Sequence, residues 1–281
     1  MKAKKSKENE PSVSYKAASV SDMTVGSPMR QIIKFALPLI FGYILQQMYL
    51  VIDAAIVGRW IGVEALAAVG ASSSIMFLVM GFCNGACAGF IMLQSANNAL
   101  GTTCVAAFTA SIRIKYLFTC VFENIGVAMA TYCGQNLGAR QMARITKGVK
   151  DAICLMLAYF VFTFIVIYPF ADWMMRLFVD SGEAEVVSRA AEYMRIANYF
   201  YPTLGLLTIL RYSIQGLGFS NLSMLSGVME MIARCGVSLW LVPTLAWTGV
   251  CLGDPVAWIM ADIFLIPAFL WVQHRLKKQA I

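Results

Sequence analysis

Residues 35–57 read FALPLIFGYILQQMYLVIDAAIV, an apolar stretch with one charged side chain, that of Asp53. About 20 such residues in a helix cross the roughly 30 Å hydrocarbon core of a bilayer, so the stretch predicts a transmembrane helix. A carboxylate at membrane depth costs about 2.5–3.5 kcal/mol on insertion scales. We therefore predict that Asp53 binds a proton or a cation.

The rest of the chain has the same character. Of its 281 residues, 59% are hydrophobic and 13% are charged, whereas soluble domains carry about 25% charged residues. The sequence therefore predicts an all-α polytopic membrane protein with about seven transmembrane helices plus a helix remnant. After residues 35–57, the expected spans are Leu66–Phe90, Tyr116–Cys133, Ala152–Ala171, Tyr199–Leu217, Val237–Val250 with its flanks, and Val256–Val272.

The net charge of +7 comes from lysines and arginines that gather at the ends of a few spans. Loops on the cytoplasmic side of membrane proteins carry such an excess. We therefore expect cytoplasmic N- and C-termini, a plasma (inner) membrane location and no nucleic-acid partner. Residues 1–28 are polar and predict a disordered cytoplasmic tail. The basic clusters are Lys2 to Lys16, Arg30 and Lys34, Arg140 to Lys150, and Arg275 to Lys278.

Catalytic and metal-binding residue types are sparse. His274 is the only histidine and lies in a basic tail, which excludes a histidine-based catalytic or zinc site. The eight cysteines are spread over several apolar stretches, where they are expected to be small buried side chains. The sequence therefore predicts neither an enzyme nor a bound cofactor.

The chain also matches itself at an offset of 39 residues, where Ala65–Ser72 aligns with Cys104–Ser111. Alanine-rich helices match easily, so composition explains the match as well as a repeat does. Leu66–Leu100, about 35 residues without a loop, would form a helix about 52 Å long. That is too long for one crossing and short for two. Either a tight turn at Asn84-Gly85 makes two short spans, or a stretch of chain is missing near Gly89.

Two series of motifs stand out against this background. The first is Gly26-Ser27, Phe35–Leu39, Gln46–Tyr49, Ile52-Asp53, Val57–Arg59 and Ala65–Gly70; the second is Leu93–Gly101, Gly134–Ala139, Leu210–Gly218, Glu230–Arg234 and Gly253–Trp258. In this order and spacing they resemble the motifs of the multidrug and toxic compound extrusion (MATE) transporters. The first series resembles the first two helices of that family, and the second resembles its helices seven, eight, ten, eleven and twelve.

The resemblance implies a partial MATE-like two-lobe bundle. Family members have twelve helices in two six-helix lobes. Residues 29–89 would then be the first two helices of the N-terminal lobe, and residues 90–281 would be the C-terminal lobe from the end of helix seven onward. Helices three to six and the front of helix seven would be absent, with the junction near Gly89-Phe90.

The resemblance also implies a function, which is efflux of organic, often cationic, compounds coupled to proton or sodium antiport. An acid on the first helix takes part in that coupling in the family, and Asp53 matches its position. Gln46, Gln47 and Tyr49 are candidates for the cavity or the substrate site, and so is Arg211, which lies inside a span and needs a partner. Glu230 and Arg234 are four residues apart and are expected to form a structural ion pair.

Further expectations stay open at this stage. The internal deletion would impair transport, and self-association would complete the missing lobe. Besides membrane lipid and small organic cations, a lipid-linked saccharide is an alternative substrate, for a flippase that would show a more cationic cavity; a non-transporting product is a further alternative. Lys115 is expected near a helix end with its ammonium group at the interface. Asp262 has no obvious partner in the sequence.

Overall fold

The computed structural model describes residues 22–69, 87–178 and 183–279. Every element within these ranges is helical, and residues 63–69 are helical as well. The elements are α1 (Pro28–Ile56), the π-helical turn η1 (Val57–Ile61), α3 (Cys87–Asn98), α4 (Thr102–Gly138), α5 (Met142–Met175), α6 (Ala184–Tyr199), α7 (Tyr201–Gly216), α8 (Ser220–Gly236), the π-helical turn η2 (Val237–Leu241), α9 (Val242–Leu245), α10 (Trp247–Cys251) and α11 (Gly253–Gln279).

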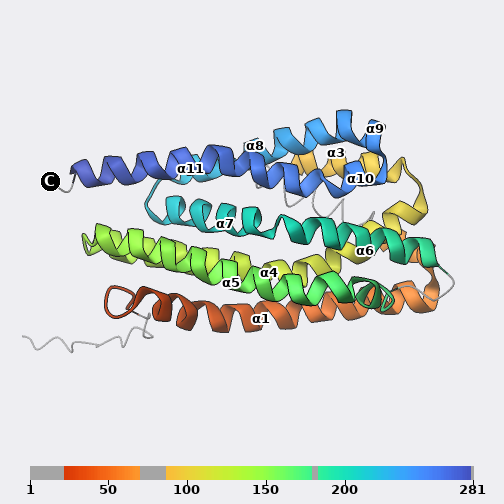
Figure 1. Cartoon of the computed structure of the whole chain (residues 1–281), viewed down its shortest axis with the longest axis horizontal. Helices are drawn as coiled ribbons and strands as arrows, with labels where there is room; N and C mark the ends of the chain where they lie inside the picture. Colours follow the sequence, from red (N-terminus) through yellow and green to blue (C-terminus); the bar gives the residue numbers. More distant parts are fainter. Residues whose placement is uncertain (1–21, 70–86, 179–182, 280–281) are drawn as a thin grey trace, which may run out of the picture.

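The long helices lie side by side along one axis and alternate in direction (Figure 1). Helix α4 is the centre of the bundle, since it packs against α1, α5, α6 and α7. Helix α11 packs against α7 and α8 and ends at the same end of the bundle where α1 starts (Figure 1). The largest side chains in the core come from α4, α6 and α7, among them Phe108, Phe122, Tyr132, Tyr193 and Tyr201.

Five helices among the described residues are long and apolar enough to cross a membrane. Together α6 and α7 also run the length of the bundle (Figure 1). The prediction of an all-α, multi-span protein is therefore confirmed, while most of the expected span Leu66–Phe90 lies outside the described ranges. The five are Pro28–Ile61, Thr102–Gly138, Met142–Met175, Ser220–Leu245 and Trp247–Lys278.

Two expected spans have different limits in the structure. The stretch Tyr199–Leu217 corresponds to α7, which continues the direction of α6 after a break at Phe200 (Figure 1). The break occurs there because Pro202, in the first turn of α7, lacks the backbone N–H that a continuous helix requires. The stretch Val237–Val250 is not one helix. The helix that contains its first half begins at Ser220, and the chain turns at Ala246, whose φ is 48°.

Close helix contact in the core depends on glycine. A Cβ atom at Gly216 of α7 would lie 2.2 Å from the carbonyl oxygen of Ala130 in α4. At Gly89 of α3 it would lie 2.8 Å from the carbonyl oxygen of Met231 in α8. Small residues let helix backbones approach closely in membrane proteins. These glycines therefore set how closely α7 packs on α4 and α3 packs on α8.

The segment before α1 is ordered from residue 22. Met23 is fully buried, and its backbone N–H donates to Gln135 Oε1 over 2.7 Å. Arg144 donates to the carbonyl oxygens of Met23 and Gly26 over 3.1 and 2.8 Å. The predicted disordered tail therefore extends too far at its end, because residues 22–27 are fixed to the turn between α4 and α5. Residues 1–21 lie outside the described ranges.

The junction region is described only in part. Helix α3 packs against α8, and the chain passes from Asn98 to the start of α4 at Thr102 through a turn at Gly101, whose φ is 101°. Helix α4 then runs to Gly138 at the opposite end of the bundle (Figure 1). The alternative of a tight turn at Asn84-Gly85 lies outside the described residues.

Candidate functional site

Three of the predicted site residues lie on one exposed face of α1. Gln46, Tyr49 and Asp53 are spaced by three and four residues, which places them on one side of a helix. All three are exposed, and Tyr49 is 71% exposed. The structure therefore brings these three side chains onto a single surface, which we call the α1 face.

Apolar side chains surround Asp53 on this helix. Ile52, Ile56 and Trp60 are 52%, 53% and 82% exposed. No ion pair or hydrogen bond to the Asp53 carboxylate occurs among the residues that the structure describes. An acid without a partner on an apolar helix does not suit contact with lipid, because charged side chains at membrane depth face a bundle interior or a water-filled cavity.

Gln47 and Arg211 lie elsewhere. Gln47 is 5% exposed, and its Oε1 atom has no hydrogen-bond donor among the described residues. Arg211 lies on α7, where its Nε donates to Ser226 Oγ over 2.9 Å and its Nη2 pairs with Glu230. The structure thus places Arg211 in a second cluster, away from the α1 face.

This second cluster is a chain of ion pairs that joins α4, α7, α8 and α11. Glu230 pairs with Arg211 and, over 3.1 Å, with Arg234. Arg234 also pairs with Asp254 over 3.2 Å, and Asp254 pairs with Lys115 over 2.5 Å. The predicted pair of Glu230 and Arg234 is thus two members of a five-residue network.

Hydrogen bonds complete the Asp254 end of the network. The hydroxyl of Tyr193 in α6 donates to Asp254 Oδ2 over 2.7 Å, and Lys115 Nζ donates to the Tyr193 hydroxyl oxygen over 3.1 Å. Lys115 is 5% exposed and lies well inside α4. The expectation of an ammonium group at the membrane interface is therefore wrong, because α4 begins at Thr102 and Asp254 neutralises Lys115 in the core.

A cavity of about 160 Å³ opens beside this network. Glu123 of α4 also lines it; Tyr212 donates to Glu123 Oε2 over 3.3 Å, and no ion pair involves Glu123 within the described ranges. Drug-sized ligands occupy about 300–1,000 Å³, so this cavity suits a smaller group. Its lining is Phe90, Lys115, Tyr116, Thr119, Glu123, Leu204, Leu207, Arg211, Glu230, Arg234, Asp254 and Trp258.

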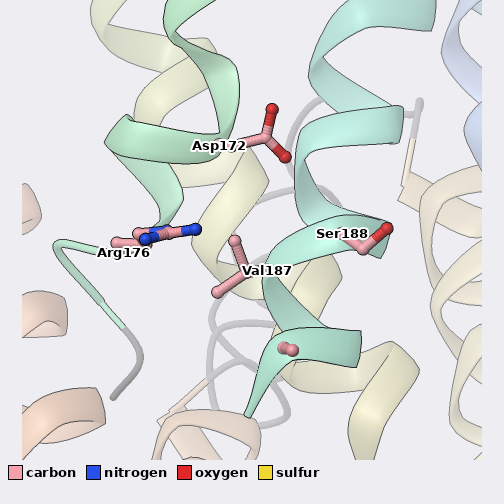
Figure 2. A pocket seen from close by; sticks show the side chains of 5 residues that line it. Asp172, Arg176, Val187 and Ser188 are labelled. Atoms are coloured by element: carbon pink, nitrogen blue, oxygen red, sulfur yellow. The ribbon is translucent and has the colours of Figure 1, made fainter. Parts of the chain in front are cut away.

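A second hollow of about 170 Å³ lies between the end of α5 and the start of α6. Figure 2 shows Asp172 of α5 and Arg176, the residue after α5, extending toward it, while Ser188 of α6 points away from Arg176. Asp172 pairs with Arg195, and its side chain is 45% exposed. The hollow is therefore bordered by one member of a partly exposed ion pair rather than by a buried network.

Sequence reasoning missed Lys115, Glu123 and Asp254 as members of a site. Their signal was present, since each is a charged residue in or beside an apolar stretch, and such residues mark functional positions by default. What the sequence lacked was their proximity, because Lys115 and Asp254 lie 139 positions apart. The part of the chain that the structure describes holds no group of three His, Cys, Asp or Glu side chains placed to bind a metal ion.

Comparison with known proteins gives consistent matches. The sequence model of the MatE family matches residues 38–99 and 90–240, so the two matches overlap where the junction was predicted. The probable multidrug resistance protein YpnP of Bacillus subtilis (strain 168) is 21% identical over 154 residues, which cover 55% of this chain and 32% of that protein.

Solved structures share the fold. The inward-facing conformation of a multidrug resistance MATE family transporter of the MOP superfamily matches with a TM-score of 0.58 and 21% identity, over 68% of this chain and 44% of that one. A MOP superfamily transporter from Pyrococcus furiosus, whose binding pocket of reverse polarity is said to suggest a different function, matches with a TM-score of 0.58 and 20% identity, over 76% and 46%. The chain thus spans about a third to under a half of the length of these relatives.

Proposed function

Because this chain belongs to the MatE family, we propose that it is a secondary active transporter that exports small organic cations in exchange for protons or sodium ions. The observation that carries the proposal is Asp53, an acid without a described partner on the exposed α1 face. MatE is a family of transporters, so the proposal assigns no catalytic residue and no prosthetic group.

Asp53 is the coupling residue in this proposal. A proton or a sodium ion at its carboxylate neutralises the charge, and an organic cation competes for the same charge. Binding of either one then favours different arrangements of the helices, because a ligand shifts a conformational equilibrium toward the state that it binds better. Gln46 and Tyr49 share the α1 face with Asp53 and would contact the organic cation beside it.

We propose that the protein lies in the plasma (inner) membrane and that the basic end of the bundle faces the cytoplasm. The start of α1, the α4–α5 turn and the end of α11 lie at this end (Figure 1). They carry Arg30, Lys34, Arg144, Lys147 and Arg275. The rule that cytoplasmic loops carry the excess of lysine and arginine supports this orientation.

The α1 face requires a covering surface for transport. Efflux in a two-lobe bundle uses a cavity between the lobes, and this chain spans under half of the solved transporters that it matches. We therefore propose that two copies associate through their α1 faces, so that each supplies the lobe that the other lacks. Transport by a single copy is expected to be weak or absent.

The test is flux in reconstituted vesicles. Purified protein is inserted into liposomes loaded with a fluorescent organic cation such as ethidium, and a proton or sodium gradient is applied. Gradient-driven movement of the dye is expected for the unaltered chain and is expected to fall to background in Asp53→Asn. Glu64→Gln is the matched control, because Glu64 is an exposed acid that lies beyond the Pro28–Ile61 span.

Two results would contradict the proposal. Equal flux in Asp53→Asn and in the unaltered chain would remove Asp53 from the coupling step. Absence of gradient-driven flux from protein that is folded and associated in detergent would favour the non-transporting alternative. Light scattering measures the association, since a pair has twice the 30.9 kDa mass of one chain.

A further inference from the structure

The cavity beside the ion-pair network has an unbalanced charge. The network runs from Lys115 through Asp254, Arg234 and Glu230 to Arg211, so that three cations are paired with two carboxylates. The excess is one positive charge. All five side chains line the cavity. An uncompensated charge in a protein interior is unfavourable, because its hydration has been removed. The network therefore requires a counter-ion.

The excess positive charge lies at the two ends of the network, Lys115 and Arg211. Lys115 has one carboxylate, which it shares with Arg234, and Arg211 has one carboxylate, which it also shares with Arg234. Arg211 is the less covered of the two, because its side chain is 25% exposed whereas that of Lys115 is 6% exposed. An anion in the cavity is therefore expected to bind at the Arg211 end.

Glu123 is the internal candidate for the counter-ion. It lines the cavity; its burial and the charge of Glu230 oppose the charged carboxylate, whereas the charge of Arg211 favours it. The other titratable groups that act on it are Tyr212 of α7 and Tyr43 of α1. Asp262 of α11 is also attracted by Arg211, but it does not line the cavity. Among the described residues that line the cavity, Glu123 is thus the one acid outside the network.

We propose that this cavity binds a small oxyanion, a phosphate or carboxylate group, at the guanidinium groups of Arg211 and Arg234. The planar guanidinium group matches the geometry of both kinds of oxyanion and donates two parallel hydrogen bonds to them. The bound oxyanion replaces Glu123 as the counter-ion of Arg211, and the Glu123 carboxylate takes up a proton. The apolar lining from Leu204, Leu207 and Trp258 accommodates the uncharged remainder of the ligand.

The size of the cavity supports this class of ligand. Its volume of about 160 Å³ corresponds to about five water molecules at the volume of liquid water. That space holds one phosphate group with a few attached atoms, and it is too small for a drug-sized cation. The inference goes beyond the proposed function, since it concerns a separate cavity and does not depend on Asp53.

The test is equilibrium binding to the full-length protein in detergent. Isothermal titration calorimetry with inorganic phosphate, acetate and tetraethylammonium is expected to show binding of the two anions and none of the cation at this cavity. Titration in two buffers with different heats of ionisation measures the protons that accompany binding. Uptake of at most one proton per anion is expected, because any negative charge on Glu123 is exchanged for that on the ligand.

Two variants separate the roles of the cavity residues. Arg211→Gln is expected to weaken anion binding by about 10–100-fold, the effect of losing a charged hydrogen bond. Glu123→Gln keeps the size of the side chain but removes the competing charge, so it is expected to strengthen binding by about tenfold and to abolish proton uptake. Arg189→Gln and Glu185→Gln, in the exposed pair at the start of α6, are matched controls and are expected to bind as the unaltered chain does.

Nanodiscs identify the source of the oxyanion. Weaker phosphate binding in phospholipid discs than in a phosphate-free detergent assigns the cavity to a lipid headgroup, whereas equal binding in both assigns it to a free anion. Weaker binding in Glu123→Gln, or a tetraethylammonium affinity that this variant abolishes, would overturn the proposal. If Arg211→Gln does not fold, Glu123→Gln still decides, because its expected effect is a gain. Binding measured without a gradient is independent of transport, so failure here leaves the proposed antiport untouched.

Discussion

Asp254 is expected to be the most sensitive member of the ion-pair network. The residue is 4% exposed, and its carboxylate has three partners: Lys115 at 2.5 Å, the Tyr193 hydroxyl at 2.7 Å and Arg234 at 3.2 Å. Asp254→Asn preserves the shape of the side chain and removes its charge. Arg234 then keeps Glu230, but Lys115 is left as a buried cation without a carboxylate. Removing one partner of a buried ion pair costs about 3–5 kcal/mol, so we expect a loss of unfolding free energy in that range.

Two companion variants test whether the lost unfolding free energy comes from the ion pair between Lys115 and Asp254. Lys115→Met removes the cation, while Asp254 retains Arg234 and Tyr193, so a smaller loss of about 1–3 kcal/mol is expected. The double variant Lys115→Met, Asp254→Asn removes both charges at once. Its loss is expected to be smaller than the sum of the single losses by about 0.5–3 kcal/mol, the usual size of coupling between residues in contact.

The assay is reversible unfolding of the purified protein in mixed micelles, followed by tryptophan fluorescence as dodecyl sulfate is added. Asp172→Asn is the matched control, because Asp172 pairs with Arg195 but its side chain is 45% exposed. Exposed pairs contribute about 0–1 kcal/mol. If Asp254→Asn costs no more than Asp172→Asn, or if the losses of the single variants simply add, the network is not the buried, coupled structure described above.

Two further outcomes are expected. Gly216→Ala places a Cβ atom 2.2 Å from a backbone oxygen of α4. It should lower the unfolding free energy by about 1–3 kcal/mol, because it forces the helices apart. Gly42→Ala is the control, since its Cβ atom meets nothing within 4 Å, and it should not lower the unfolding free energy in the same assay. Arg144→Gln removes two bonds that hold residues 22–27, so amide hydrogen exchange of that segment should accelerate by about tenfold or more, whereas in the exposed Arg140→Gln it should not. Unchanged exchange in Arg144→Gln would mean that another contact fixes the segment.

Some helices could be predicted from the sequence because their apolar runs are uninterrupted. The stretches 152–171 and 256–272 lie within α5 and α11, and 35–57 lies within α1 except for Val57, the first residue of η1. Their signal is local, since the number of consecutive apolar residues decides whether a segment can cross a bilayer. The same argument fails where a span carries charge. Because of Lys115, the predicted span omitted the first part of α4. Because of Glu230 and Arg234, the next predicted span omitted the first part of the helix that begins at Ser220.

The sequence by itself determined that the chain is an all-helical membrane protein and that Asp53 lies in its first apolar helix, because hydropathy and charge are properties of consecutive residues. Only the tertiary structure decided that Asp53 lies on an exposed face while Lys115, Arg211, Arg234 and their carboxylates share one cavity. Which cation neutralises which acid depends on a few ångströms between helices. Those distances are set by how side chains and glycines pack, as between Lys115 and Asp254 across 139 positions of chain.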